Sequence, residues 1–191
     1  MPRTRREPAA LDWPKSMPTT IDPIDDFAAT CERFLALCTD DVRPEIERLW
    51  SRRSTLGELI AGMDRLPVCT EPYDYDEGPT YEDIRRRVGP RYPSLGYYHE
   101  VMNPLAAGDP PDAAIGDAID DLVDTYRELA CGLRHLRAGR RREAVGHWRN
   151  GFYSHWGSHA LGAARAIHEH LQKSGWLPSE GDPPGAPRSH A

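Results

Sequence analysis

Apolar residues recur at helical spacing between positions 142 and 172, and no proline interrupts them. On a helical projection of about 100° per residue, they form one broad stripe centred on Phe152. The other members of this stripe are Val145, Trp148, Trp156, Ala163, Ala166 and Ile167. A stripe of this width is typical of a helix packed into a hydrophobic core. The pattern predicts one long helix over residues 142–172, placed centrally in the fold.

Glycines occur on both flanks of this predicted helix. Gly146 and Gly157 share one flank, and Gly151 and Gly162 share the other. A glycine inside a helix costs about 1 kcal/mol relative to alanine. We therefore expect neighbouring helices to approach closely on both flanks; the alternative is a local bulge near His155.

A second long helix is predicted just before the first, from residue 111 or 112 to Arg137. Its apolar residues follow the alternating three-and-four spacing of a packed seam: Ile115, Ile119, Leu122, Tyr126, Leu129, Leu133 and Leu136. Gly139 is well placed to end it. The short turn that follows predicts an antiparallel helical hairpin of residues 112–138 and 142–172.

The first half of the chain also shows helical patterns. Asp22 and Pro23 form a typical helix start, and apolar spacing then continues to about Thr39. Residues 41–63 give a second helical region, which Ser54 or Thr55 could divide; the pattern leaves its continuity open.

Two shorter helices are expected after a proline-rich break. Thr80 with Asp83 resembles a capping pattern for a helix to Val88. Residues from Pro93 or Ser94 to Met102 could form another. No strand pattern of useful length, internal repeat or second domain is evident.

The remaining segments are predicted to be loops and disordered terminal segments. Residues 1–20 and 176–191 are rich in proline, charge or glycine, which predicts a disordered arm and tail. Residues 67–80, with acidic and tyrosine residues alternating, and residues 103–111 are expected to be loops. The predicted fold class is therefore all-α, a single-domain helical bundle over residues 21–175.

Composition narrows the function. The chain has 191 residues, 39% of them hydrophobic, which suits one globular core. The net charge of −6 argues against nucleic acid as the main partner. No run long enough to span a membrane and no secretory signal is evident, so we expect a cytoplasmic protein. The cysteines form no CxxC pair and are expected to be buried and reduced.

The most distinctive chemistry is a pair of histidines on the apolar stripe. His155 and His159 lie one helical turn apart, so both imidazoles can reach one divalent cation. A further ligand would come from the preceding helix, where Asp121 and Glu128 share a flank. The sequence thus permits a site of two histidines and one carboxylate.

Other polar residues on the preceding helix receive different predictions. Thr125 and Tyr126 lie between the two candidate carboxylates and could join a polar network with the histidines. Asp120 and Asp124 are expected to project outward into solvent.

A structural interpretation competes with the metal site. Buried imidazoles can simply be satisfied by carboxylate, tyrosine or backbone partners. No Glu-x-x-His motif supports a metal. The favoured function is therefore an interaction or accessory module with an unidentified protein partner and no cofactor. The alternative is a metal-dependent enzyme with one divalent ion; substrate and oligomeric state stay open.

An arginine cluster marks the turn of the hairpin, and its members are Arg134, Arg137, Arg140, Arg141 and Arg142. Such a cluster could bind an anion or an acidic partner. A solvated turn is the alternative, because runs of like charge usually face water.

Two motifs carry a family resemblance: Ile119-Asp-Asp-Leu-Val-Asp-Thr-Tyr-Arg-Glu-Leu129 and His155-Trp-Gly-Ser-His-Ala160. Together they resemble the bacterial family known as domain of unknown function 5063, from about Phe27 to about His168. The resemblance implies a small, mostly helical protein without an assigned activity. The His-x-x-x-His pair also resembles DinB-like metal-binding bundles, which would imply His99 as a further ligand. The continuation expected in those bundles after His159 is missing.

Overall fold

The computed structural model describes residues 22–40, 42–69, 78–101 and 113–175. The predicted arm (1–20), the predicted tail (176–191), most of the acidic loop and the loop at 103–111 lie outside the described residues.

Two long helices occupy the first part of the described chain. Helix α1 spans Pro23–Thr39, and the side chain of Asp22 caps it by accepting a hydrogen bond from the backbone N–H of Ile24. Helix α2 spans Glu45–Met63 without a break at Ser54 or Thr55, which settles its continuity. It begins directly after Pro44, a residue that restricts its predecessor to extended backbone.

The capping pattern at Thr80 correctly predicts helix α3, Tyr81–Val88, because the threonine hydroxyl accepts from the N–H of Asp83. A 3₁₀ turn, Gly89–Arg91, follows. The helix expected from residue 93 or 94 to 102 is wrong, since Tyr97–Val101 is strand β1.

Strand β1 pairs antiparallel with strand β2, Ala113–Asp117, in a register that places Tyr97 opposite Asp117 and His99 opposite Ile115. The prediction of a helix from residue 111 or 112, and of no strands, is therefore wrong here. Neither strand shows a strict apolar alternation, because the hairpin packs only partly on the bundle. Cross-strand pairing, which a single stretch of sequence does not reveal, decides its conformation.

Helix α4 consequently starts later than expected, at Ala118, and runs to Arg137. The side chain of Asp117 caps it by accepting from the N–H groups of Ile119 and Asp120. Gly139 follows the helix with a φ of 77°, a left-handed conformation that favours glycine, so the predicted end of the helix is confirmed.

The last long helical run is continuous but not uniform. Helix α5 spans Arg141–Gly151, a π-helical turn spans Phe152–Trp156, and helix α6 spans Gly157–Lys173. The bulge near His155, the less favoured alternative in the sequence pattern, is therefore present. The apolar stripe is confirmed at Trp148, Trp156 and Ile167, which are fully buried.

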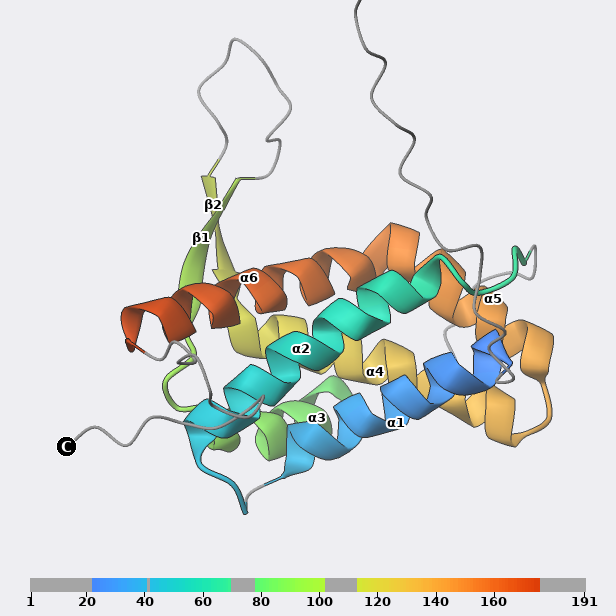
Figure 1. The fold of residues 1–191 in the computed structure, drawn as a ribbon, viewed down its shortest axis with the longest axis horizontal. Helices are drawn as coiled ribbons and strands as arrows, with labels where there is room; N and C mark the ends of the chain where they lie inside the picture. Colours follow the sequence, from blue (N-terminus) through green and yellow to red (C-terminus); the bar gives the residue numbers. More distant parts are fainter. Residues whose placement is uncertain (1–21, 41, 70–77, 102–112, 176–191) are drawn as a thin grey trace, which may run out of the picture.

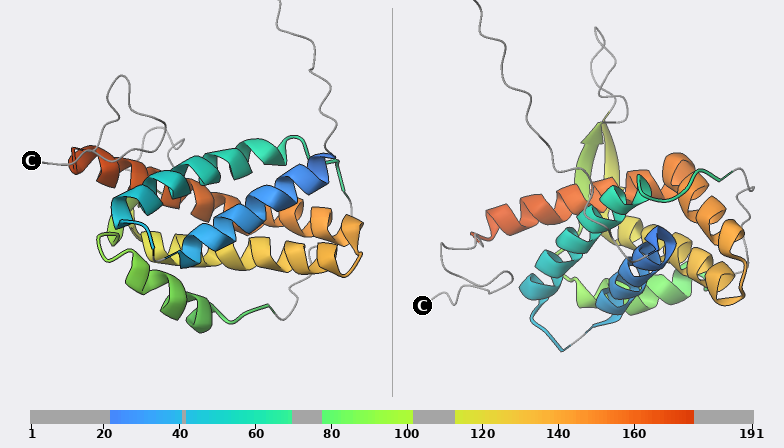
Figure 2. Two further views of the ribbon diagram at one scale, coloured as in Figure 1. Left: turned by 60° about the horizontal axis from the view of Figure 1, so that its bottom comes forward. Right: turned by 45° about the vertical axis from the view of Figure 1, so that its right-hand side comes forward.

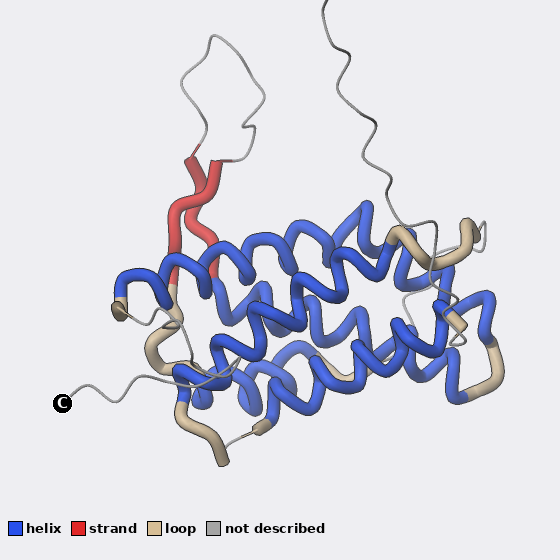
Figure 3. Tube along the Cα trace, viewed as in Figure 1, coloured by secondary structure: helices blue, strands red, loops and turns tan. Residues whose placement is uncertain are grey.

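Helix α4 lies at the centre of the bundle and packs against α1, α3, α5 and α6, while α2 bridges α1 and α6 (Figures 1 and 2). The C-terminal run thus forms the predicted antiparallel hairpin with α4, although α4 is the more central partner. Figure 3 shows the two strands projecting from one side of the bundle. The fold is mostly helical, as predicted, with the strand hairpin added. Among the described residues, no helix combines the length and apolar character needed to cross a membrane.

Candidate metal centre

The two predicted histidines each face a carboxylate on α4. Nδ1 of His155 lies 2.9 Å from Oε1 of Glu128, and Nδ1 of His159 lies 2.8 Å from Oδ1 of Asp121. The structure therefore brings together all four residues that the sequence proposed as ligands. In both pairs the carboxylate contacts Nδ1 of the imidazole. An ion bound at Nε2 would therefore not displace either carboxylate.

The two imidazoles also lie close to a carboxylate that the sequence assigned to solvent. Asp124, His155 and His159 each offer one donor atom, and these atoms lie within 4.8 Å of one another. Nε2 of His159 lies 3.8 Å from Oδ2 of Asp124. Because the Nδ1 atoms face Glu128 and Asp121, Nε2 is the nitrogen of each ring that could coordinate an ion.

The expectation that Asp120 and Asp124 project into solvent is wrong for Asp124. Its side chain is only 14% exposed and lies 3.4 Å from Arg127. Asp120 is more exposed but hydrogen-bonds the hydroxyl of Tyr81. Asp124 is far from both histidines in the sequence. The packing of α4 against the C-terminal helical run brings it close to them.

Thr125 and Tyr126 do not contact the histidines through any hydrogen bond found among the described residues. Thr125 is fully buried, and its hydroxyl has no hydrogen-bond partner within this part of the chain. Burial raises the pKa of Tyr126, whose nearest charges include Arg87. Arg87 belongs to α3, so Tyr126 lies on the side of α4 that packs against α3.

A third histidine, His147, adjoins the cluster and was missed by the sequence reasoning. It is 2% exposed, and its Nε2 lies 2.9 Å from Oε2 of Glu128. On a regular α-helix His147 lies about 140° from Phe152, away from the apolar stripe. It also lies about 80° from His155, but the extra residue of the π turn removes most of this difference of about 80°. Both imidazoles can therefore face Glu128.

The π turn is followed by Gly157, a position where a side chain would not fit. Its backbone N–H donates to the carbonyl of Phe152, five residues earlier, which defines the π geometry. A Cβ at this position would collide with that carbonyl oxygen. A signal for the bulge was therefore present in the sequence as a glycine within an otherwise strong helical pattern.

The electrostatics favour charge on His159. Its hydrogen bond to Asp121 raises the pKa of the imidazole above 6.5, against the opposing effect of burial, and the charges of Asp121, Asp124 and Asp120 raise it further. A metal ion at Nε2 would therefore compete with a proton on this residue.

A cavity of about 520 Å³ adjoins His159 on the side of the strand hairpin. Its lining includes Glu100, Ile115 and Asp117 of the hairpin, Asp120 and Asp121 at the start of α4, and Ser158 and His159 of α6. This volume is within the range of small-molecule sites. The candidate centre is thus accessible, which agrees with side-chain exposures of 31% for His155 and 26% for His159.

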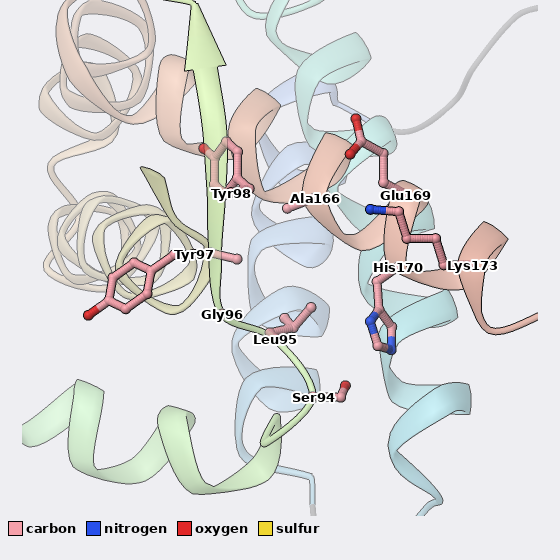
Figure 4. A pocket seen from close by; sticks show the side chains of 10 residues that line it. Ser94, Leu95, Gly96, Tyr97, Tyr98, Ala166, Glu169, His170 and Lys173 are labelled. Atoms are coloured by element: carbon pink, nitrogen blue, oxygen red, sulfur yellow. The ribbon is translucent and has the colours of Figure 1, made fainter. Parts of the chain in front are cut away.

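A second hollow lies near the C-terminal end of α6 (Figure 4), where Ser94, Leu95 and Tyr98 face Glu169, His170 and Lys173. Its volume is about 140 Å³, smaller than typical ligand sites. Its lining includes neither His155 nor His159.

Other residues singled out by sequence lie apart from the centre. His99 is exposed on β1 and is not among the residues that converge with His155 and His159, so the DinB-like ligand set does not form. In the arginine cluster, Arg141 pairs with Asp22 at 2.8 Å and Asp25 at 2.7 Å. Arg137 pairs with Glu32 of α1 at 2.9 Å, so carboxylates of the same chain occupy these two arginines. Cys31, Cys38 and Cys131 are buried thiols outside any disulfide, as expected, and Cys69 is partly exposed.

Fold and site together define a helical bundle with a histidine–carboxylate cluster between its central and C-terminal helices. The chain belongs to the family described as domain of unknown function DUF5063, whose model matches residues 21–173. This confirms the resemblance seen in the two motifs.

A solved structure supports the fold. The crystal structure of protein BF1032 from Bacteroides fragilis is similar with a TM-score of 0.59 and 16% identity, over 77% of this chain and 90% of that one. At this identity the likeness concerns the fold alone. No curated protein matches this chain.

Proposed function

We propose that this protein binds a divalent transition-metal ion through Asp124, His155 and His159. One observation carries the proposal: both Nδ1 atoms face buried carboxylates, and one donor atom of each histidine lies within 4.8 Å of the other and of a carboxylate oxygen of Asp124. Histidine ligands of metals commonly donate their second N–H to a carboxylate, which fixes the tautomer and raises the basicity of the coordinating nitrogen. Glu128 and Asp121 fit that supporting role.

The donor set selects a class of ion. Two imidazoles and one carboxylate suit zinc, iron, manganese, cobalt or nickel better than magnesium or calcium, which prefer oxygen donors. Three protein ligands leave a coordination position for water or substrate. Such an ion would supply an acidified water or a polarised substrate oxygen, which supports hydrolytic or transfer chemistry.

The donors would have to draw together when the ion binds. Donor atoms on a tetrahedral ion at about 2.1 Å lie about 3.4 Å apart, whereas Nε2 of His159 lies 3.8 Å from Oδ2 of Asp124 and the three donor atoms lie within 4.8 Å of one another. Asp124 is the side chain best able to move, because its contact with Arg127 is a long 3.4 Å. Both imidazoles are held by shorter contacts.

The test is elemental analysis of untagged protein purified without chelators. The expected result is near-stoichiometric transition metal that is lost in His155→Ala, His159→Ala and Asp124→Asn. His168→Ala is the matched control, since His168 lies on α6 at an exposed position away from the cluster. Absence of bound metal, together with no binding on addition of zinc, cobalt or manganese, refutes the proposal.

A second candidate function, binding of a protein partner, is favoured by the outward face of the strand hairpin. Tyr97 is 78% exposed and Ile115 is 63% exposed, and the register places them on the same face of the sheet. Figure 4 shows Tyr97 pointing away from α6. Exposed apolar residues gathered on one element are a common feature of interaction sites.

The partner proposal has its own test. A photo-crosslinking residue at position 115, expressed in the native host, should capture one protein, and Tyr97→Ser should weaken that capture. Position 42 is the control, because Val42 is 93% exposed on a different part of the molecule. Equal capture from both positions, or none from position 115, contradicts a specific interface on the hairpin.

A further inference from the structure

The two carboxylates behind the histidines share an arrangement that the metal proposal does not require. Each has one oxygen on a histidine of the candidate centre and its other oxygen on a further polar side chain. Asp121 accepts a 2.7 Å hydrogen bond at Oδ2 from the hydroxyl of Tyr98. Glu128 has Nε2 of His147 at 2.9 Å from Oε2.

Both carboxylates are deeply buried, so their orientation depends on these contacts. The side chain of Glu128 is 3% exposed and that of Asp121 is 9% exposed. A buried carboxylate loses its hydration and must be satisfied by protein groups. Both oxygens of Asp121 are hydrogen-bonded, and Glu128 has a hydrogen bond to His155 at one oxygen and a 2.9 Å ion-pair contact with His147 at the other. Rotation of either carboxylate would break a close contact.

The two outer residues are themselves held in place. Tyr98 reaches Asp121 from the strand hairpin across Gly162, where an added Cβ would collide with its hydroxyl. His147 is 2% exposed, and its ring lies against that of His135 with centroids 5.7 Å apart. The two residues come from different elements, β1 and α5, yet occupy equivalent places relative to the centre.

We propose that Tyr98 and His147 are positioning residues for the metal centre. Tyr98 fixes Asp121, and His147 fixes Glu128, so that each carboxylate presents one oxygen to Nδ1 of its histidine. That contact in turn keeps both imidazoles in the Nδ1–H tautomer with Nε2 directed at the ion. The inference rests on the proposed function, and it assigns a role to the hairpin and to the π turn.

The experiment uses Co²⁺ as the probe, because its visible absorption reports coordination geometry and its affinity can be measured by competition with a chromophoric chelator. The variants are Tyr98→Phe, His147→Leu and His147→Gln, measured on the full chain. We expect Tyr98→Phe and His147→Leu each to weaken Co²⁺ binding about 10-fold or more and to alter the spectrum. His147→Gln retains an N–H donor and should restore most of the affinity.

Thr125→Val is the matched control, because Thr125 is equally buried on α4 and its hydroxyl makes no hydrogen bond among the described residues. It should leave the Co²⁺ affinity and spectrum unchanged. If Tyr98→Phe and His147→Leu also leave both unchanged, the positioning role is refuted while metal binding stands. If His147→Leu fails to fold, the conservative Tyr98→Phe variant still decides the outcome.

A second readout needs no metal. Long-range ¹⁵N–¹H correlation spectra of the metal-free protein report the tautomer of each histidine. His159 should lose its preference for Nδ1–H in Tyr98→Phe, and His155 should lose it in His147→Leu. Unchanged tautomers in both variants refute the inference, and a wild-type protein that binds no Co²⁺ refutes the proposed function together with it.

Discussion

The hydroxyl of Tyr98 donates a 2.7 Å hydrogen bond to Oδ2 of Asp121 directly over Gly162. This contact joins the strand hairpin to α4 and passes across α6 at Gly162. A glycine leaves room there because any other residue would place a Cβ against the Tyr98 hydroxyl. The neighbouring oxygen of Asp121 holds His159, so the packing of the hairpin and the geometry of the candidate centre are linked.

Gly162→Ala should therefore destabilise the protein, although glycine-to-alanine changes inside helices usually stabilise. An added Cβ would collide with the Tyr98 hydroxyl and lie 2.9 Å from Oδ2 of Asp121. Overpacking of this kind costs about 1–3 kcal/mol, which outweighs the helix-propensity gain of about 1 kcal/mol. Urea unfolding would measure the difference.

Gly57→Ala is the matched control, since Gly57 lies in α2 and a Cβ there meets no atom within 4 Å. It should stabilise the protein by up to about 1 kcal/mol. The double variant Tyr98→Phe with Gly162→Ala should recover part of the loss, because the clashing oxygen is gone. Stabilisation by Gly162→Ala alone would show that Tyr98 does not occupy this position.

The stability of the metal-free protein should depend on pH through His159. Its partner Asp121 raises the folded-state pKa above 6.5. The folded state then binds the proton more tightly than the unfolded state, so this stabilisation is complete below about pH 6.5 and is lost as the pH rises through the raised pKa. The free energy of unfolding of wild type relative to His159→Gln should therefore be larger at about pH 6 than at about pH 9.

Chemical unfolding at both pH values, with a chelator present, measures this dependence. Asp121→Asn should reduce the difference between the two pH values because it removes the partner charge. A difference that is constant with pH would mean that His159 is not preferentially protonated in the folded protein.

The π turn makes an unusual prediction about chain length. Deleting Ser154, an exposed residue within the turn, should convert Phe152–Trp156 to ordinary α-helix while keeping His147 and His155 on one face. Seven residues in an α-helix return to within about 20° of the same direction. Co²⁺ binding should therefore survive the deletion.

Inserting one alanine after Ser154 is the opposite change. It adds about 100° of rotation between α5 and α6 and should abolish Co²⁺ binding and lower the melting temperature. If the deletion is as harmful as the insertion, the π turn contributes something other than the alignment of the two histidines.

Metal should stabilise the folded chain through Asp124. At a free ion concentration one hundred times the dissociation constant, binding adds about 2.7 kcal/mol to the free energy of unfolding. Asp124→Asn should remove most of this gain while changing the metal-free stability by less than about 1 kcal/mol, since its contact with Arg127 resembles weak helix-surface pairs. Thermal unfolding with and without zinc measures both quantities.

Asp83→Asn is the control for this variant, because Asp83 pairs with Arg86 at the same spacing but away from any histidine. It should leave the zinc-induced shift intact. An undiminished shift in Asp124→Asn would place the ion elsewhere in the molecule.

Local sequence patterns are enough to predict the helices that carry strong periodic signals and clear caps. Asp22, Thr80 and Gly139 mark helix ends because capping and left-handed backbone are local properties of a few residues. The pairing of His155 and His159 was visible for the same reason: residues one turn apart on a helix face the same way.

The set of residues that form the candidate centre depends instead on how the elements pack together. Asp124 was assigned to solvent from its helical angle, but the angle at which α4 crosses α6 turns it toward the histidines. His147 joins them through the π turn, and Tyr98 joins through a strand hairpin whose conformation depends on pairing between segments distant in sequence. Such contacts depend on how elements meet, and periodicity within one element carries no information about that.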